Sequence, residues 1–154
     1  MSEINLTQNS HEDWMKKALR LATKAMLEDE VPVGAIVVYK GKIIGQGYNQ
    51  CNTLNDATAH AEMLAITAAS NTLGDWRLND CTMYVTKEPC PMCAGAAYWT
   101  RLKKVVIAAH DDKRGYRSIN ENMLHPKTKV KWGVMEVECS TILKEFFAKK
   151  RNGF

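Results

Sequence analysis

Two short segments of the sequence combine residue types and spacings suited to metal-dependent catalysis. The first is Thr58-Ala59-His60-Ala61-Glu62, and the second is Glu88-Pro89-Cys90-Pro91-Met92-Cys93. Each is expected to open a helix, where a spacing of three residues places Cys90 and Cys93 on one face, within reach of a single ion. Zinc favours tetrahedral coordination by nitrogen and sulfur, and a catalytic site keeps its fourth position for water. We therefore expect His60, Cys90 and Cys93 to bind Zn²⁺.

Glu62 lies two residues after His60. It is close enough to reach a water molecule on the ion, but it is poorly placed to ligate the same ion. Zinc lowers the pKa of bound water towards about 7, which provides hydroxide at neutral pH. Attack on an aromatic ring also requires a proton at the accepting ring nitrogen, and a mobile carboxylate can deliver it and later protonate departing ammonia. We expect Glu62 to be the catalytic proton shuttle of a hydrolytic deamination.

Each half of this pattern has another explanation when it stands alone. A single C-x-x-C occurs as a redox pair or as half of a structural zinc site, and His60 or Glu62 alone could be an ordinary polar residue at a helix start. Together and in this order, H-x-E followed by P-C-x-x-C is the signature of zinc-dependent deaminases. Cys51 and Cys81 lack a partner at suitable spacing for a fourth ligand, so we interpret both as small apolar side chains.

The elements around the two segments predict an α/β fold. Ser10 is expected to cap a helix that ends near Glu30, because Pro32 disfavours helical geometry in the residue before it. Two strands, 33–39 and 43–49, are expected to form a hairpin. Strands at 82–86, 105–109 and 134–137 then alternate with helices at 59–69, 91–100 and 139–150, while 51–56 and 110–131 are expected to be irregular. This order predicts a three-layer α/β/α sandwich with a mixed five-stranded sheet.

The length of 154 residues fits one domain, which we expect to span residues 11–154 behind a flexible N-terminal tail at 1–10. That tail has no basic stretch followed by an apolar run, and no segment approaches the roughly 20 apolar residues of a membrane span. The five cysteines are an odd number, with one C-x-x-C pair. This argues against a disulfide framework and predicts a cytoplasmic protein whose thiols are free to bind metal.

The charge is distributed unevenly along the chain. Residues 1–100 contain 8 Lys and Arg against 11 Asp and Glu, whereas residues 101–154 contain 13 against 6. This asymmetry predicts a polyanionic partner for the C-terminal third. A lysine-rich solvated surface is the alternative explanation, and charge alone does not distinguish the two.

The motifs resemble those of the bacterial tRNA-specific adenosine deaminases, a family of the cytidine deaminase superfamily. The similarity extends from His11 to Arg151 and includes Glu30-Val31-Pro32-Val33-Gly34-Ala35, Gly47-Tyr48-Asn49, both metal-binding segments and the final Phe146-Phe147 with Lys149-Lys150-Arg151. The resemblance implies conversion of adenosine to inosine at the wobble position of a tRNA anticodon loop. It also implies one zinc ion per subunit and a homodimer.

The resemblance also assigns roles outside the metal-binding segments. Asn49 matches the asparagine that contacts the flipped nucleoside in the family. Asp111 and Lys113 lie in the loop that contacts the anticodon stem-loop, and Phe147, Lys150 and Arg151 lie where the family stacks on and clamps the RNA. Each has a structural alternative, because an Asn can end a strand at a turn, a Phe on an amphipathic helix can belong to the core, and terminal basic residues can be solvated.

Two alternative functions share the same motifs. Tyr98-Trp99-Thr100-Arg101 is similar to the Y-W-x-R of bacterial guanine deaminases, and Lys87 stands where the adenosine deaminases more often have a small or apolar residue. A basic C-terminal third is not needed for a small neutral base, which favours tRNA over guanine. A non-catalytic RNA-binding module stabilised by zinc would not need Glu62, which is present. Free cytidine deaminases would carry Cys at position 60, and the biosynthetic pyrimidine deaminases have a longer insertion between their cysteines.

Overall fold

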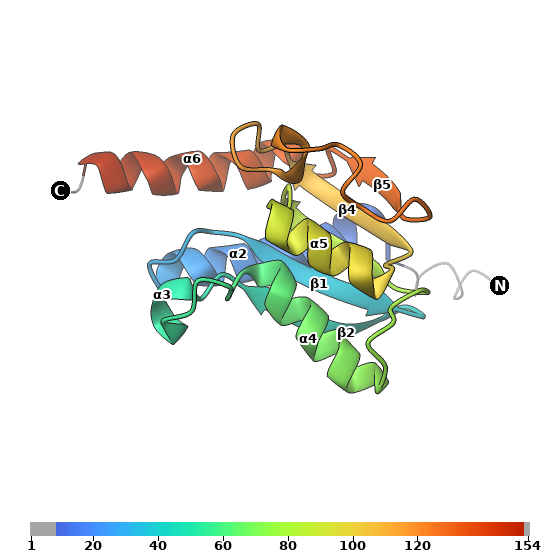
Figure 1. The fold of residues 1–154 in the computed structure, drawn as a ribbon. Coiled ribbons are helices and arrows are strands. Elements are labelled where there is room, and N and C mark those ends of the chain that lie inside the picture. The colour runs from blue at the N-terminus through green and yellow to red at the C-terminus, as the bar shows by residue number, and fades with distance from the viewer. Residues whose placement is uncertain (1–8, 153–154) are drawn as a thin grey trace.

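A mixed five-stranded sheet in the order β2-β1-β3-β4-β5 forms the centre of the fold (Figure 1). The structure is a computed structural model and describes residues 9–152, so most of the predicted flexible tail, residues 1–8, lies outside the described part. β1 is antiparallel to both of its neighbours, whereas β3, β4 and β5 are parallel. The strands are β1 (Gly34–Tyr39), β2 (Lys42–Tyr48), β3 (Thr82–Lys87), β4 (Lys104–Ala109) and β5 (Lys129–Trp132).

Helices cover both faces of this sheet, which confirms the predicted three-layer sandwich. α4 (Ala61–Leu73) and α5 (Pro91–Thr100) lie in front of the sheet in Figure 1, and α2 (His11–Leu27) lies behind it. α6 (Glu136–Asn152) contacts α2, β3 and β4 and extends past the sheet at the upper left of Figure 1. Two glycines allow this close packing. A Cβ at Gly34 would lie 2.1 Å from the Ala18 carbonyl oxygen in α2, and one at Gly45 would lie 2.3 Å from that of Ala65 in α4.

Local sequence signals explain where several elements begin and end. Ser10 and Asp13 form a reciprocal capping box at the start of α2, as predicted. The β1–β2 hairpin turns through Lys40 and Gly41, which both have positive φ angles of 48° and 74°, the conformation of a two-residue hairpin turn. α4 ends before Gly74, its C-cap residue, which adopts the left-handed conformation with a φ of 72°.

The segment 51–56 was predicted to be irregular, but it contains a one-turn helix, α3 (Cys51–Leu54). The buried Glu30 explains this difference. Its carboxylate accepts hydrogen bonds from the backbone N–H groups of Asn52 and Thr53 and from the Thr53 hydroxyl. The capping group therefore lies more than twenty residues upstream, where no local pattern could reveal it.

The prediction of a last strand at 134–137 is wrong. The fifth strand is β5, which lies in the stretch predicted to be irregular and alternates exposed lysines with partly buried Val130 and Trp132. After it, Gly133 and Met135 have positive φ angles of 86° and 59°, which end the extended conformation before α6 begins. A short 3₁₀ helix, η1 (Tyr116–Ser118), also lies in the stretch predicted to be irregular.

Smaller differences concern helix ends. α2 ends at Leu27 rather than near Glu30, α4 is shifted towards the C-terminus relative to 59–69, and α6 is longer than 139–150 at both ends. Within residues 9–152, no helix is both long and apolar enough to span a bilayer.

The topology brings three strand ends to one edge of the sheet. Because β1 is antiparallel to both β2 and β3, these two strands run in the same direction, and β4 runs parallel to β3. The residues that follow them, Asn49, Glu88 and His110, therefore leave the sheet at the same edge. Ligand sites in α/β folds commonly form at the carboxyl ends of such strands.

Candidate active site

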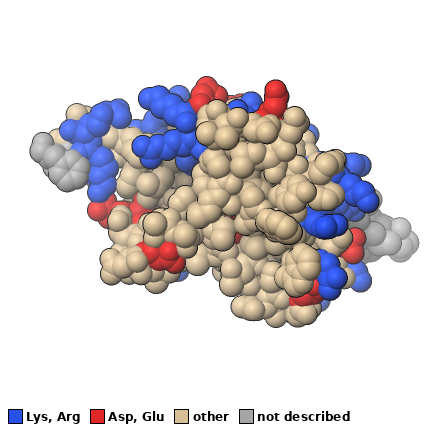
Figure 2. Space-filling model, in the orientation of Figure 1, with Lys and Arg blue, Asp and Glu red and all other residues tan. Residues whose placement is uncertain are grey.

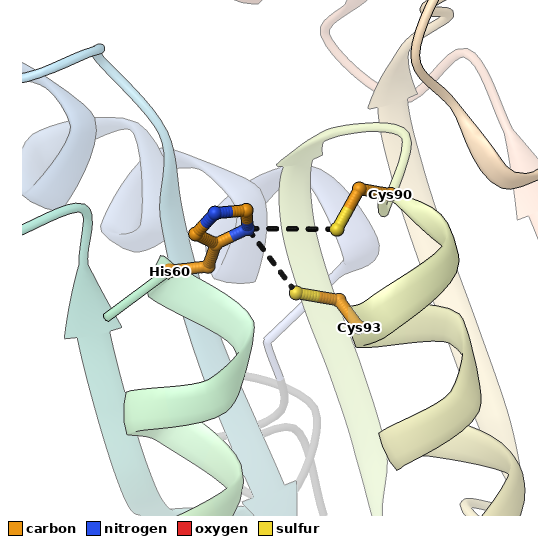
Figure 3. A group of neighbouring side chains, drawn as sticks. All are labelled: His60, Cys90 and Cys93. Atoms are coloured by element: carbon orange, nitrogen blue, oxygen red, sulfur yellow. Dashed lines mark hydrogen bonds between the residues drawn. The ribbon is translucent and has the colours of Figure 1, made fainter. Parts of the chain in front are cut away.

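His60, Cys90 and Cys93 lie together at this edge, as the sequence predicts. The Nδ1 atom of His60 is 3.5 Å from the sulfur of Cys90 and 3.6 Å from that of Cys93 (Figure 3). Their ligand atoms all lie within 4.8 Å of one another, and within residues 9–152 no other group of three His, Cys, Asp or Glu side chains is close enough to share an ion. One imidazole nitrogen and two sulfurs match the donor set of a catalytic zinc site with one position left for water.

The local conformation explains why these side chains face one another. His60 is the N-cap of α4 and Cys90 is the N-cap of α5, and neither side chain caps its own helix. Pro91 occupies the first helical position after Cys90, which fixes the start of α5. Cys93 lies one turn further along the same helix. Two helix N-termini thus point at the site, and their positive ends favour thiolates.

The electrostatics of the two sulfurs are asymmetric. A hydrogen bond from Cys93 and a second interaction with His60 lower the pKa of Cys90 to about 4, against the opposing effect of burial. The shared proton and burial raise the pKa of Cys93. The hydrogen bond with Cys90 raises the pKa of His60. The Cys90 thiolate, the Cys93 sulfur and the His60 nitrogen are three potential metal ligands that face one another. A divalent cation bound between them would replace the proton that the two cysteines share.

Glu62 lies in the first turn of α4, beside these ligands and only 3% exposed. Burial raises its pKa, and the negative charge at Cys90 adds to this effect against the backbone N–H that favours the carboxylate. Its burial away from bulk water suits a group that takes up and releases a proton during catalysis. Every buried side-chain nitrogen and oxygen atom among the described residues has a hydrogen-bond partner.

Asn49 follows β2 and borders the same site. Its side-chain Oδ1 accepts a hydrogen bond of 2.8 Å from the backbone N–H of Ala61, the residue after His60. Oδ1 therefore already accepts one hydrogen bond from the backbone, and the two N–H groups at Nδ2 are the hydrogen-bond donors of this side chain. The structural and functional explanations of Asn49 are compatible, because one end of the amide caps α4 and the other is available to a ligand.

A cleft of about 680 Å³ opens beside His60 and Cys90. This volume lies within the usual range of ligand-binding sites. Its walls come from the metal-binding segments, from the loop after β4 and from α6. The lining residues are Val31, Asn49, Cys51, His60, Lys87, Cys90, Ala109, His110, Asp111, Lys113, Arg114, Ser140, Leu143, Lys144, Phe147 and Arg151.

One face of α6 lines this cleft. Ser140, Leu143, Lys144, Phe147 and Arg151 recur at helical spacing, which places them on the same side of the helix. Phe147 is 44% exposed, whereas its neighbour Phe146 is buried. Phe147 is therefore not the core residue that the structural alternative supposed. Figure 2 shows lysine and arginine side chains gathered over α6 at the upper left.

The residues predicted to contact RNA line two different grooves. Asp111, Lys113, Phe147 and Arg151 line the cleft with His60 and Cys90. Lys150 lines a second groove, between the end of α2 and α6, where its ammonium group pairs with Asp29 at 2.5 Å and lies 5.5 Å from the centre of the Phe146 ring.

The structure adds cleft residues that the sequence did not indicate. Lys87 and Lys144 contribute further positive charge, and His110 stacks on Trp132 with ring centroids 4.7 Å apart while it pairs with Glu136. Cys51, interpreted as an apolar side chain, is half-buried in the cleft wall. These residues come together only because elements distant in the sequence pack against one another, so their spacing in the sequence does not indicate that they line one cleft.

Comparison with known proteins shows that the chain is similar to deaminases over nearly its whole length. The family model described as MafB19-like deaminase matches residues 9–151. A tRNA-specific adenosine deaminase of Bacillus subtilis (strain 168) is 44% identical over 143 residues, which cover 90% of this chain and 89% of that protein.

Solved structures of similar fold include deaminases named for different substrates. One, from work on A-to-I editing by tRNA:A34 deaminases at the wobble position of transfer RNA, has a TM-score of 0.78 and 38% identity and covers 84% of this chain and 98% of its own. The guanine deaminase of Bacillus subtilis has 45% identity but a TM-score of 0.64, and it covers 66% of each chain. Guanine deaminases therefore share this fold as well, since that of Nitrosomonas europaea has a TM-score of 0.76 and covers 89% of this chain, and the fold alone does not separate the two activities. By its motifs, its fold and its relatives, the chain belongs to the tRNA-specific adenosine deaminase family.

Proposed function

We propose that the protein hydrolyses adenosine to inosine at the wobble position of a tRNA anticodon loop. The observation that carries the proposal is the cleft itself. His60 and Cys90 line this cleft together with five basic side chains, Lys87, Lys113, Arg114, Lys144 and Arg151. Five cations in one cleft exceed what a single neutral base requires, whereas an RNA loop brings a phosphate with every nucleotide.

We propose that His60, Cys90 and Cys93 bind one Zn²⁺ ion per subunit. A zinc ion in this site would activate a water molecule for attack on the ring carbon that bears the amino group. The buried Glu62 carboxylate accepts the proton of that water and delivers it to the adjacent ring nitrogen of adenine. Glu62 then takes the remaining proton from the added hydroxyl group and transfers it to the departing amino group, so that water and adenosine yield inosine and ammonia.

Other residues of the cleft hold the substrate in this proposal. Asn49 donates from Nδ2 to the extruded nucleoside, while its Oδ1 holds the Ala61 N–H. The exposed ring of Phe147 provides a surface on which a neighbouring base stacks. Asp111 and Lys113 contact the RNA from the loop after β4, and Arg151 contacts it from α6, with Lys150 at the outer side of that helix. Anticodon loops already splay their bases, so extrusion costs little.

We further propose that the enzyme is a homodimer in the cytoplasm. Trp99 and Tyr98, on α5, are 69% and 39% exposed, and neighbouring exposed aromatic side chains are typical of interface cores. Free thiols suited to metal binding fit a reducing compartment. Sedimentation analysis tests the dimer, and Trp99→Ala is expected to shift it towards the monomer.

The test of the substrate compares two reactions under the same conditions. The protein is incubated with an anticodon stem-loop that carries a wobble adenosine and, separately, with free guanine. We expect inosine in the stem-loop and no efficient formation of xanthine. Efficient xanthine production without inosine would instead assign the guanine deaminase activity to this site.

A further inference from the structure

Two consecutive residues at the end of β3 form ion pairs with the loop that follows β4. The ammonium group of Lys87 is 2.8 Å from Asp111 Oδ2, and the buried carboxylate of Glu88 is 2.8 Å from Arg117 Nη2. Arg117 also donates to Glu88 through Nε and through its backbone N–H. Lys87 and Glu88 lie three and two residues before Cys90. The two ion pairs therefore join the segment that carries Cys90 to the loop after β4, whose Lys113 and Arg114 line the cleft.

Asp111 sets the course of that loop. Its Oδ1 accepts hydrogen bonds from the backbone N–H groups of Lys113 at 3.3 Å and Arg114 at 3.1 Å, and its carbonyl accepts from Gly115 at 2.8 Å. The loop also approaches Glu88 closely, since a Cβ at Gly115 would lie 2.3 Å from the Glu88 carboxyl group. The position of one carboxylate therefore decides where the side chains of Lys113 and Arg114 enter the cleft.

Lys87 completes the charge balance of this arrangement. The backbone N–H of Asp111 donates to Glu88 at 3.1 Å, so the two acidic residues lie close together. Arg117 neutralises Glu88, and Lys87 neutralises Asp111. The side chains of Lys87 and Asp111 are only 24% and 18% exposed, which limits screening by water. An apolar residue at position 87 would leave Asp111 Oδ2 without this partner, and the carboxylate would be held only by the Lys113 and Arg114 N–H groups at Oδ1.

We propose that Lys87 is a positioning residue for RNA: it holds Asp111, and through Asp111 it holds Lys113 and Arg114 in the orientation that binds the anticodon loop. The proposal rests on the proposed function. It concerns how tightly the RNA binds, and it assigns Lys87 no part in proton transfer. Lys87→Met removes the charge and keeps much of the side-chain length.

The first experiment measures steady-state kinetics of Lys87→Met on the anticodon stem-loop. We expect KM to rise about tenfold, as for the loss of one charge-assisted hydrogen bond, with kcat within about twofold of the parent. Lys87→Arg should restore KM. The matched control is Lys104→Met, because Lys104 contacts His11 at the opposite end of the sheet and should leave both constants unchanged. An unchanged KM in Lys87→Met, or an equal rise in Lys104→Met, would overturn the proposal.

A double-mutant cycle separates positioning from direct contact with RNA. If Lys87 acts through Asp111, the variant with both Lys87→Met and Asp111→Asn should bind no more weakly than Asp111→Asn alone. Effects that multiply would show that Lys87 contacts the RNA by itself, which contradicts the proposal.

Hydrogen exchange in the free protein makes the inference independent of the substrate. Lys87→Met should speed exchange at the amides of Lys113, Arg114 and Gly115, and Lys104→Met should not. If the parent forms no inosine, the proposed function fails, but this measurement still tests the link between Lys87 and the loop. Unchanged exchange at the three amides would refute that link.

Discussion

Asn49 accepts a hydrogen bond from the backbone N–H of Ala61 and so joins the end of β2 to the first turn of α4. The bond lies directly beside His60 and Glu62, which are the neighbours of Ala61 in the chain. A single amide therefore caps the start of the helix that carries His60, a proposed zinc ligand, and Glu62, the proposed proton shuttle. Asn49 also lines the cleft, where the nucleoside is expected to bind.

Two substitutions at this position separate its two roles. Asn49→Asp keeps an oxygen acceptor for Ala61 but removes the Nδ2 donors, so we expect normal zinc content and a raised KM. Asn49→Ala removes both and leaves a partly buried N–H without its partner, which costs about 1 to 3 kcal/mol of stability. Urea unfolding, metal analysis and kinetics on the stem-loop check these outcomes. Equal stability of the two variants would contradict the structural role of Oδ1.

The metal-binding assignment predicts about one zinc ion per chain, since two sulfurs and one imidazole complete a three-residue catalytic set. Cys93→Ala should lose most of the zinc, because it removes a buried ligand and the partner that shares a proton with Cys90. Cys81→Ala is the control, because Cys81 is equally buried but lies away from the site. Metal analysis of the purified variants measures the outcome. Full zinc retention in Cys93→Ala would remove this residue from the ligand set.

The residues that the sequence predicted best are those whose geometry is local. His60 and Glu62, like Cys90 and Cys93, are separated by two or three positions at helix starts, so spacing alone fixes how they lie relative to one another. The alternation of strands and helices likewise predicted the layered fold. The missed strand β5 is short, and its alternation of Lys129 and Lys131 with Val130 and Trp132 was hidden within a basic stretch.

The contacts that complete the site could not be predicted, because they join distant parts of the chain. Lys87 meets Asp111 across 24 positions, and Asn49 meets Ala61 across 12. Lys144 lines the cleft because α6 packs across the strand ends, although its helical spacing equally permits a solvated face. Composition predicted the basic third of the chain, but only the packing of α6 separates Arg151 in the cleft from Lys150 in the second groove.

The buried ion pair of Glu88 predicts a pH-dependent loss of stability. Burial acts to raise the pKa of Glu88, but the hydrogen bonds from Arg117 and Asp111 outweigh it and hold the pKa below its ordinary value of 4.5. The stabilisation is therefore complete above the ordinary pKa and is lost as the pH falls through the lower pKa of the folded protein.

Glu88→Gln tests this contribution. We expect a loss of about 1.5 to 3 kcal/mol at neutral pH, because the buried Glu88 side chain loses its charge-assisted hydrogen bonds to the partly exposed Arg117. The difference from the parent should shrink once the pH is below the folded pKa, where the parent carboxylate is protonated as well. The exposed Glu121→Gln serves as the control. Urea unfolding at both pH values measures the effect, and a difference independent of pH would be the contrary result.

The two sides of α6 predict different salt dependence of RNA binding. Arg151 lines the cleft, so Arg151→Ala should lower the slope of binding affinity against salt concentration by up to about one unit. Lys150→Ala should have a smaller effect, because Lys150 pairs with Asp29 in the second groove. Titrations of the stem-loop at several salt concentrations check both variants. An unchanged slope in Arg151→Ala would place that residue outside the RNA interface.

The central claim is that this site adds the oxygen of water to adenosine at one position of an RNA loop, with Glu62 moving the protons. The most direct measurement is mass spectrometry of the stem-loop after reaction in water labelled with heavy oxygen. We predict that the label appears in inosine at the wobble position with the parent protein. Glu62→Gln should slow the reaction roughly 100- to 10,000-fold at unchanged zinc content. Inosine without label, or activity of Glu62→Gln within about threefold of the parent, would contradict the account.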